Sequence, residues 1–138
     1  MLFLLSACLA RLPVAKTITD PRTVLARAMS EAQLQQAVIE AAKFNGWHVA
    51  HFRAGMTRRG RWVTPVSGDG AGFPDLVLAH PDRGVLFVEL KAEQGKITSR
   101  QAIWLTLLGT CNKTYVWRPR DWLVGTIMAI LRGSEETP

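Results

Sequence analysis

The sequence predicts an α/β domain in which a small sheet lies between helices, and two observations support this fold class. First, two short apolar runs at 76–79 and 85–88 flank the turn residues 80–84, which is the pattern of an antiparallel hairpin. Second, both faces of that hairpin are apolar, and a sheet that is buried on both faces usually has helices packed against it. We therefore expect a small mixed sheet flanked by helices, in an α/β or α+β domain.

A helix is expected on each side of the hairpin. Ser30, with Gln33 three positions later, has the pattern of a capping box that begins a helix over residues 30–45. Thr98 or Ser99 is expected to cap a second helix that runs to about Leu108. The remaining elements are strands at 47–53 and 113–117 and a last helix at 120–131, which give the order helix, strand, hairpin, helix, strand, helix.

The composition indicates one intracellular domain with an anionic partner. The chain has 138 residues, of which 48% are hydrophobic, so it can form its own core and is not disordered throughout. Cys8 and Cys111 have no C-x-x-C spacing and are too few for a disulfide framework, so we expect a cytoplasmic protein. The formal net charge of +6 favours a nucleic acid as the partner.

Residues 1–28 are expected to be an N-terminal extension that precedes a domain at 29–133, with a tail at 134–138. The segment 5–8, Leu-Ser-Ala-Cys, resembles a lipoprotein cleavage box, but its apolar run is shorter than the roughly 7–15 residues of a signal and no basic residue precedes it. Basic residues and a proline at 11–16 interrupt the segment, so no membrane association is expected. The extension is expected to be disordered, or to be an overcalled start if translation begins at Met29.

Ionisable residues interrupt the apolar pattern at the open end of the hairpin. If the turn closes through His80 and Gly84, Asp75 lies directly opposite Glu89, and Lys91 lies on the same face as Glu89. A longer turn would separate the two carboxylates, unless a bulge near residue 74 restored their register. Because adjacent carboxylates repel each other, this pair is a candidate for binding a divalent cation.

Mg²⁺ fits this pair, because it takes oxygen ligands from one or two carboxylates and completes its shell with waters and phosphate oxygens. Mn²⁺ is expected to substitute for it. The backbone carbonyl of Leu90 is a candidate third ligand beside Asp75 and Glu89, and a cation bound there would activate a water for attack on phosphorus. Lys91 is expected to orient or deprotonate that water, or to stabilise the charge of the transition state.

These residues resemble the PD-(D/E)xK nuclease superfamily, with Pro74-Asp75, a gap of thirteen residues, and then Glu89-Leu90-Lys91. Together with Gly72-Phe73 and Ser99-Arg100-Gln101, the pattern is similar to the VRR-NUC branch over roughly residues 30–132. The resemblance implies a restriction endonuclease-like αβββαβ core, and a phage or bacterial source is expected.

The resemblance also implies roles for two residues outside the hairpin. It places Gln101 next to the metal site and supports a third acidic group, Glu31, in the first helix. A glutamate in a first helical turn is equally explained by its interaction with the helix dipole.

A basic stretch follows the first predicted strand, where four arginines fall within nine residues, Arg53, Arg58, Arg59 and Arg61. A guanidinium group binds two phosphate oxygens at once, and Trp62 can stack on an unpaired base. We expect a flexible loop that contacts a nucleic-acid backbone beside the metal site. The alternative is a solvated loop with scattered charge. After this stretch, Gly72 is expected to let the backbone approach the metal or the substrate.

The function that we expect is a Mg²⁺-dependent endo- or exonuclease that hydrolyses phosphodiester bonds of DNA. A chain with little beyond the catalytic core has no obvious module for reading sequence, so selection of branched, flapped or end-containing substrates is expected. A homodimer would place two sites on a four-way junction. The alternative is a non-catalytic nucleic-acid-binding module, which leaves Asp75, Glu89 and Lys91 unexplained.

Overall fold

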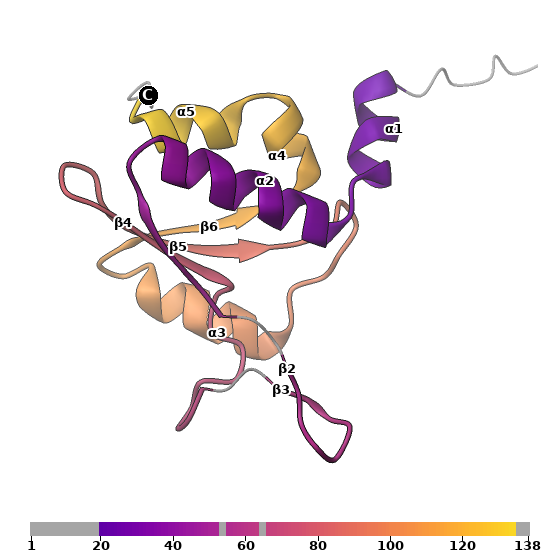
Figure 1. Ribbon diagram of the computed structural model, residues 1–138, viewed down its shortest axis with the longest axis vertical. Helices are drawn as coiled ribbons and strands as arrows, with labels where there is room; N and C mark the ends of the chain where they lie inside the picture. Colours follow the sequence, from indigo (N-terminus) through magenta and orange to yellow (C-terminus); the bar gives the residue numbers. More distant parts are fainter. Residues whose placement is uncertain (1–19, 53–54, 64–65, 135–138) are drawn as a thin grey trace, which may run out of the picture.

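A four-stranded mixed sheet forms the centre of the computed structural model, which describes residues 20–52, 55–63 and 66–134 (Figure 1). Its strands are β1 (His48–His51), β4 (Leu76–His80), β5 (Gly84–Leu90) and β6 (Lys113–Trp117), in the order β1-β4-β5-β6. β4 is antiparallel to both of its neighbours, whereas β6 is parallel to β5. The predicted α/β class and the restriction endonuclease-like αβββαβ order of the core are confirmed.

The β4–β5 hairpin has the predicted register. His80 pairs with Gly84 and Leu76 pairs with Val88. Within the turn, the backbone N–H of Asp82 donates a hydrogen bond to His80 Nδ1 at 3.1 Å, which helps to close it. Because this register continues by one residue, Asp75 lies opposite Glu89 at the open end of the hairpin.

Helix α2 (Glu31–Phe44) covers one face of the sheet (Figure 1). It begins at the predicted capping box, in which Ser30 Oγ accepts a hydrogen bond from Gln33 N at 3.1 Å and Gln33 Oε1 accepts one from Ser30 N at 2.9 Å. One stripe of the helix is apolar and packs into the main core together with alternate residues of the hairpin. The buried residues are Leu34, Val38, Ala41 and Ala42 of α2 and Leu76, Leu78, Leu86, Val88 and Leu90 of the hairpin.

Helix α3 (Ser99–Leu108) lies on the opposite side of the sheet from α2 (Figure 1). Thr98, rather than Ser99, is its N-cap, because Thr98 Oγ1 accepts a hydrogen bond from Gln101 N at 3.2 Å. None of the α3 residues is fully buried. The face of the sheet toward α3 is therefore covered much less completely than the face toward α2.

The prediction of a single helix at 120–131 is wrong, because the structure has two helices there. They are α4 (Pro119–Leu123) and α5 (Thr126–Arg132), separated at Gly125. Gly125 has φ +86°, a left-handed conformation that interrupts a right-handed helix and that glycine adopts without steric cost. α5 still packs on the core, where the indole N–H of Trp47 donates to the carbonyl of Leu131 at 2.9 Å.

The expectation of a disordered N-terminal extension is wrong for residues 21–28, which form a helix. α1 (Pro21–Ala28) begins after Asp20, whose Oδ1 accepts a hydrogen bond from Arg22 N at 3.2 Å, and it contacts α4. Residues 1–19, including the cleavage-box motif, lie outside the described residues, so the domain boundary at 29 stays a prediction. Within the described ranges, no helix has both the length and the apolar character that a membrane crossing requires.

Candidate functional site

Asp75 and Glu89 meet where the β4–β5 hairpin opens. The carbonyl of Asp75 accepts a hydrogen bond from Phe52 N at 2.9 Å, which continues the pairing of β1 with β4 by one residue. Its carboxylate oxygen Oδ2 accepts another from Leu90 N at 2.8 Å. Both the backbone and the side chain of Asp75 are thus held against the neighbouring strands. The carboxylate lies close enough to Glu89 for its negative charge to raise the pKa of Glu89.

Glu89 is a buried carboxylate with one satisfied and one unsatisfied oxygen. Only 1% of the residue is exposed. Its Oε1 accepts hydrogen bonds from Lys91 Nζ at 2.8 Å and from Gln101 Nε2 at 2.6 Å. Its Oε2 has no hydrogen-bond partner within the described part of the chain. Because a buried polar atom without a partner is costly, this oxygen is open to an additional ligand.

Gln101 is fixed at both ends of its amide. Its Oε1 accepts a hydrogen bond from Thr98 N at 2.9 Å, as part of the capping box of α3. Its Nε2 is therefore free to donate to Glu89 without a change of rotamer. The cap that begins α3 also orients the amide toward the carboxylate, which places Gln101 beside Glu89.

Burial raises the pKa values of both carboxylic acids. The pKa of Glu89 rises from 4.5 to about 7, mainly because burial penalises the charged form, and the negative charge of Asp75 raises it further against the hydrogen bond from Lys91. The pKa of Asp75 is also raised by burial, in opposition to its hydrogen bond from Leu90 N and to the positive charge of Lys91. A bound cation would reverse this effect by favouring both ionised forms.

Glu31 reaches the same site from the first turn of α2. Its Oε2 accepts a hydrogen bond from Ala92 N at 3.3 Å, and its negative charge contributes to the raised pKa of Glu89. The side chain is thus directed from α2 toward the segment that follows β5. The helix dipole also favours a glutamate at this position, and the site role that the resemblance implies for Glu31 stays a prediction.

The backbone that carries Lys91 is held by the end of β6. Lys91 N donates to the carbonyl of Trp117 at 3.1 Å. Arg118 Nη1 donates to the carbonyls of Ala92 at 2.8 Å and Glu93 at 3.3 Å. The segment after β5 is therefore fixed on two sides, by Arg118 and by Glu31. This restricts the position of the Lys91 ammonium, which is 13% exposed.

The glycine-rich segment before Asp75 packs directly on α3. Gly72 has φ +85°, and a Cβ atom added there would lie 2.7 Å from the backbone carbonyl carbon of Arg100. Its close approach is therefore to α3 at Arg100, and glycine is required for that contact. Phe73 packs edge-on against Trp104 with ring centroids 5.0 Å apart. These contacts fix the position of Asp75 relative to the helix that carries Gln101.

The expected basic loop is instead a short hairpin, so the prediction of a flexible loop is corrected. β2 (Gly55–Met56) pairs with β3 (Trp62–Val63), and Thr57 N donates to the carbonyl of Arg61 at 2.7 Å. This pairing places Arg58 and Arg59 at the tip, where both are exposed. Arg61 is exposed beside them, and Trp62 is 69% exposed. Arg53 lies outside the described residues.

The hairpin is inserted at the edge of the carboxylate site. The hairpin lies in the segment that connects the end of β1 to the start of β4. The residues at the two ends of this segment are hydrogen-bonded, because Phe52 N donates to the carbonyl of Asp75 at 2.9 Å. In Figure 1 the β2–β3 hairpin extends away from the sheet, on the side where α3 lies. The hairpin that carries the basic residues therefore begins at the end of the sheet where Asp75 and Glu89 lie.

The residues fit an ion that takes only part of its shell from the protein. No group of three or more His, Cys, Asp or Glu residues that could hold a metal occurs in the described ranges. The site offers two carboxylates, one of which has a buried oxygen without a partner. This set of oxygen donors suits Mg²⁺ or Mn²⁺, whose remaining ligands are waters and phosphate oxygens. Zn²⁺ is less suited, because it prefers nitrogen and sulfur ligands.

Sequence reasoning missed two residues of this region. His51, which no motif in the sequence singles out, lies close enough to Asp75 for a positive charge on it to lower the pKa of Asp75. Arg118 was not singled out at all, although it anchors the segment after Lys91. Arg118 acts on backbone carbonyls, and the pairing of β1 with β4 places His51, so neither position has a signature in composition or spacing.

Comparison with known proteins gives one match. Residues 26–117, more than half of the chain, match the family model described as the VRR-NUC domain. The matched region contains α2, the whole four-stranded sheet, α3 and all of the site residues predicted from the sequence. No curated protein and no solved structure matches this sequence.

Proposed function

The chain belongs to the VRR-NUC family of nuclease domains, and from this premise we propose that it is a Mg²⁺-dependent nuclease that hydrolyses phosphodiester bonds of DNA. One observation carries the proposal: the buried Oε2 of Glu89 has no partner in the described structure, while Asp75 lies beside it. When both carboxylates are ionised, a cation between them offsets their repulsion, and a hard cation with open coordination positions also binds a phosphate.

Asp75 and Glu89 are the proposed carboxylate ligands, and the carbonyl of Leu90 is the proposed third oxygen. Two hydrogen bonds support the assignment of Leu90. Lys91 N donates to β6, and Leu90 N donates to Asp75 Oδ2. Since the N–H and C=O of one residue lie on the same side of an extended strand, the Leu90 carbonyl is directed toward the side of Asp75. Mn²⁺ would substitute for Mg²⁺ because it takes the same ligands.

The bound ion would supply Lewis acidity and lower the pKa of a coordinated water. The chain supplies the remaining groups. Lys91 holds a proton at Nζ and can donate a hydrogen bond to a phosphate oxygen on which negative charge develops. Gln101 and Lys91 keep the Glu89 carboxylate in one orientation through Oε1. Glu31 adds negative charge next to the site, which strengthens its attraction for a cation.

The β2–β3 hairpin is the proposed contact with the nucleic-acid backbone. Its exposed arginines present guanidinium groups to phosphates, and the exposed ring of Trp62 offers a surface on which an unpaired base can stack. Stacking and phosphate contacts do not discriminate between base sequences. This supports selection of DNA by structure, at branches, flaps or ends, rather than by sequence.

The test is cleavage of end-labelled single-stranded, duplex, flapped and four-way DNA by purified protein, with Mg²⁺, Mn²⁺ or EDTA. The matched variant is Lys91→Ala, with Lys43→Ala in the last turn of α2 as a control for loss of a lysine. We expect metal-dependent products from the wild type and the control, no products from Lys91→Ala, and a preference for substrates with unpaired nucleotides. Tight binding of DNA without any cut strand would contradict the proposal and favour a non-catalytic binding module.

A further inference from the structure

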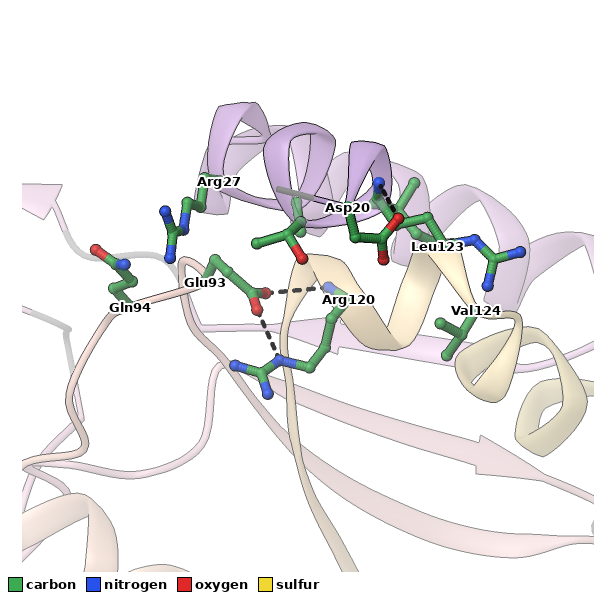
Figure 2. Close-up of a pocket in the computed structure, with 10 residues that line it drawn as sticks. Asp20, Arg27, Glu93, Gln94, Arg120, Leu123 and Val124 are labelled. Carbon is green, nitrogen blue, oxygen red and sulfur yellow. Dashed lines mark hydrogen bonds and ion pairs between the residues drawn. The ribbon is translucent and has the colours of Figure 1, made fainter. Parts of the chain in front are cut away.

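A pocket of about 340 Å³ lies between α1, α4 and the segment that follows β5 (Figure 2). In Figure 2, Arg27 of α1 and Gln94 of the segment after β5 lie at one edge of the pocket, and Glu93 is joined to Arg120 of α4. Nothing in the proposed function uses this pocket. Its polar lining residues are Asp20, Arg22, Thr23, Arg27, Glu93, Gln94 and Arg120.

Both carboxylates of the pocket already have partners. Glu93 accepts from Arg120 Nε at 2.7 Å and from Arg120 N at 3.1 Å, and it is only 11% exposed. Asp20 accepts from the backbone N–H of Arg22 as the cap of α1. By contrast, the guanidinium groups of Arg22 and Arg27 have no ion pair with any described residue. The lining therefore carries three arginines against two carboxylates, a net charge of +1, and the Glu93–Arg120 pair forms a fixed part of its wall.

One wall of the pocket continues directly from the carboxylate site. Glu93 and Gln94 follow Lys91 in the chain, and Arg118 holds the carbonyls of Ala92 and Glu93. Ala92 N, on the same segment, donates to Glu31 Oε2 at 3.3 Å. A ligand in the pocket would thus contact residues that follow Lys91 by two and three positions in the chain. The segment that carries them is held by Arg118 and by Glu31.

We propose that this pocket binds a non-scissile phosphate of the nucleic-acid substrate, with Arg27 as the principal ligand and Arg22, Thr23 and Gln94 as further donors. A guanidinium fork matches two phosphate oxygens, and the net positive charge of the pocket suits an anion. In Figure 1, α1 and the β2–β3 hairpin lie at opposite ends of the molecule, with β5 between them. The backbone would then be held on both sides of the cleavage position. This inference rests on the proposed function.

The first experiment measures DNA binding in EDTA, where no cleavage occurs, as a function of salt concentration. Arg27→Gln and the double variant Arg22→Gln/Arg27→Gln are compared with Arg132→Gln, which removes the same charge at the end of α5. The slope of log K against log salt is negative. We expect its magnitude to decrease by about 1 for each phosphate that a pocket variant no longer binds, and to stay unchanged in the control. Arg27→Lys, which keeps the charge and removes the fork, should keep the slope and bind more weakly.

The second experiment identifies the phosphate. Single neutral methylphosphonate substitutions are placed along the DNA, and the affinity of each substituted strand is measured with the wild type and Arg27→Gln. We expect one position that weakens wild-type binding and has no effect on Arg27→Gln, while the positions sensitive to the hairpin arginines are the same in both proteins. An identical interference pattern in both proteins would overturn the inference.

The two proposals fail in distinguishable ways. If the salt slope of Arg22→Gln/Arg27→Gln equals that of the wild type while DNA is still bound and cut, only the pocket is excluded. If the wild type neither binds nor cuts any DNA, the proposed function fails and the pocket assignment fails with it. Thermal melting of each variant confirms that the exposed arginines were removed without loss of the fold.

Discussion

The two faces of the central sheet differ in what their side chains do. On the face toward α2, Leu86 and Val88 pair with Leu78 and Leu76 of β4 in a fully buried apolar core. On the face toward α3, Val85 is 41% exposed and Phe87 is only half-buried. Side-chain alternation places Glu89 on this second face, after Val85 and Phe87. One face therefore supplies most of the stability, and the other has the space and the polar groups for chemistry.

This separation implies that the apolar core toward α2 and the carboxylate site can be changed largely independently, with Glu31 of α2 as the residue that reaches from one side to the other. The carboxylate pair lies where the apolar part of the α3 face ends. Its burial raises the pKa of Glu89 and so costs stability rather than adding to it. Substitutions on the α2 face should therefore mainly affect folding, and substitutions at the carboxylate site should mainly affect cleavage. The expected effects are largest at the carboxylate site and smallest at the β2–β3 hairpin.

The largest effect is expected from Glu89→Gln on the α3 face. Gln keeps the shape and can still accept hydrogen bonds from Lys91 and Gln101, but it removes the negative charge that a cation needs. Cleavage should fall by about 10²–10⁴-fold, the range seen when a group acting in the transition state is removed. At pH 8 without metal, the free energy of unfolding should stay equal or increase, because a buried charge is removed.

Initial rates of DNA cleavage and chemical denaturation measure these two quantities in the same protein preparation. Glu40→Gln, on an exposed position of α2, is the matched control for loss of one carboxylate and should cut at the wild-type rate. A clear drop in the free energy of unfolding of Glu89→Gln would mean that the carboxylate is a structural anchor, and would break the separation of the two faces.

Neighbouring residues of β5 give the next comparison. Leu86 is 2% exposed and faces α2, whereas Val85 is 41% exposed and lies on the α3 face. Leu86→Ala should lower the free energy of unfolding by about 2–5 kcal/mol, because it leaves a cavity in a close-packed core. Val85→Ala should cost less than about 1 kcal/mol. Denaturant unfolding measures both, and equal decreases would show that the two faces contribute alike.

A smaller effect is expected for the β2–β3 hairpin, which lies outside both faces. Changing Arg58, Arg59 and Arg61 together to Gln should weaken DNA binding and lower the salt slope by about one unit for each phosphate that is no longer neutralised. The unfolding transition should not move, because these side chains are exposed. Binding titrations at several salt concentrations test this, and an unchanged slope would remove the hairpin from the proposed interface.

The sequence predicts the local parts of this structure well. The register of the β4–β5 hairpin follows from the turn at His80 to Gly84, and the start of α2 follows from Ser30 and Gln33, which lie three residues apart. In these cases the interacting groups are close in the chain. The juxtaposition of Asp75 and Glu89 was predictable for the same reason, because it depends only on the length of one turn.

Features that depend on distant parts of the chain were not predictable. The break at Gly125 depends on a backbone angle that leaves the helical spacing of apolar residues unchanged. The arginine-rich stretch has the composition of a loop, and the pairing of its short strands makes it a hairpin. Arg118 binds backbone carbonyls more than twenty residues away in the chain. Because every residue has a backbone carbonyl, the sequence does not show which ones Arg118 will contact.

The central claim is that Asp75 and Glu89 together hold a divalent cation, and thermal melting with and without Mg²⁺ at pH 6 and pH 8 tests it most directly. The folded-state pKa of Glu89, about 7, lies above its ordinary value of 4.5, so without metal its contribution to stability is fully present below pH 4.5 and is lost as the pH rises through 7. Mg²⁺ competes with this proton. We therefore predict that Mg²⁺ raises Tm more at pH 8 than at pH 6 in the wild type and raises it at neither pH in Glu89→Gln. An equal increase in Tm in the wild type and in Glu89→Gln would contradict the account, because the cation would then bind elsewhere.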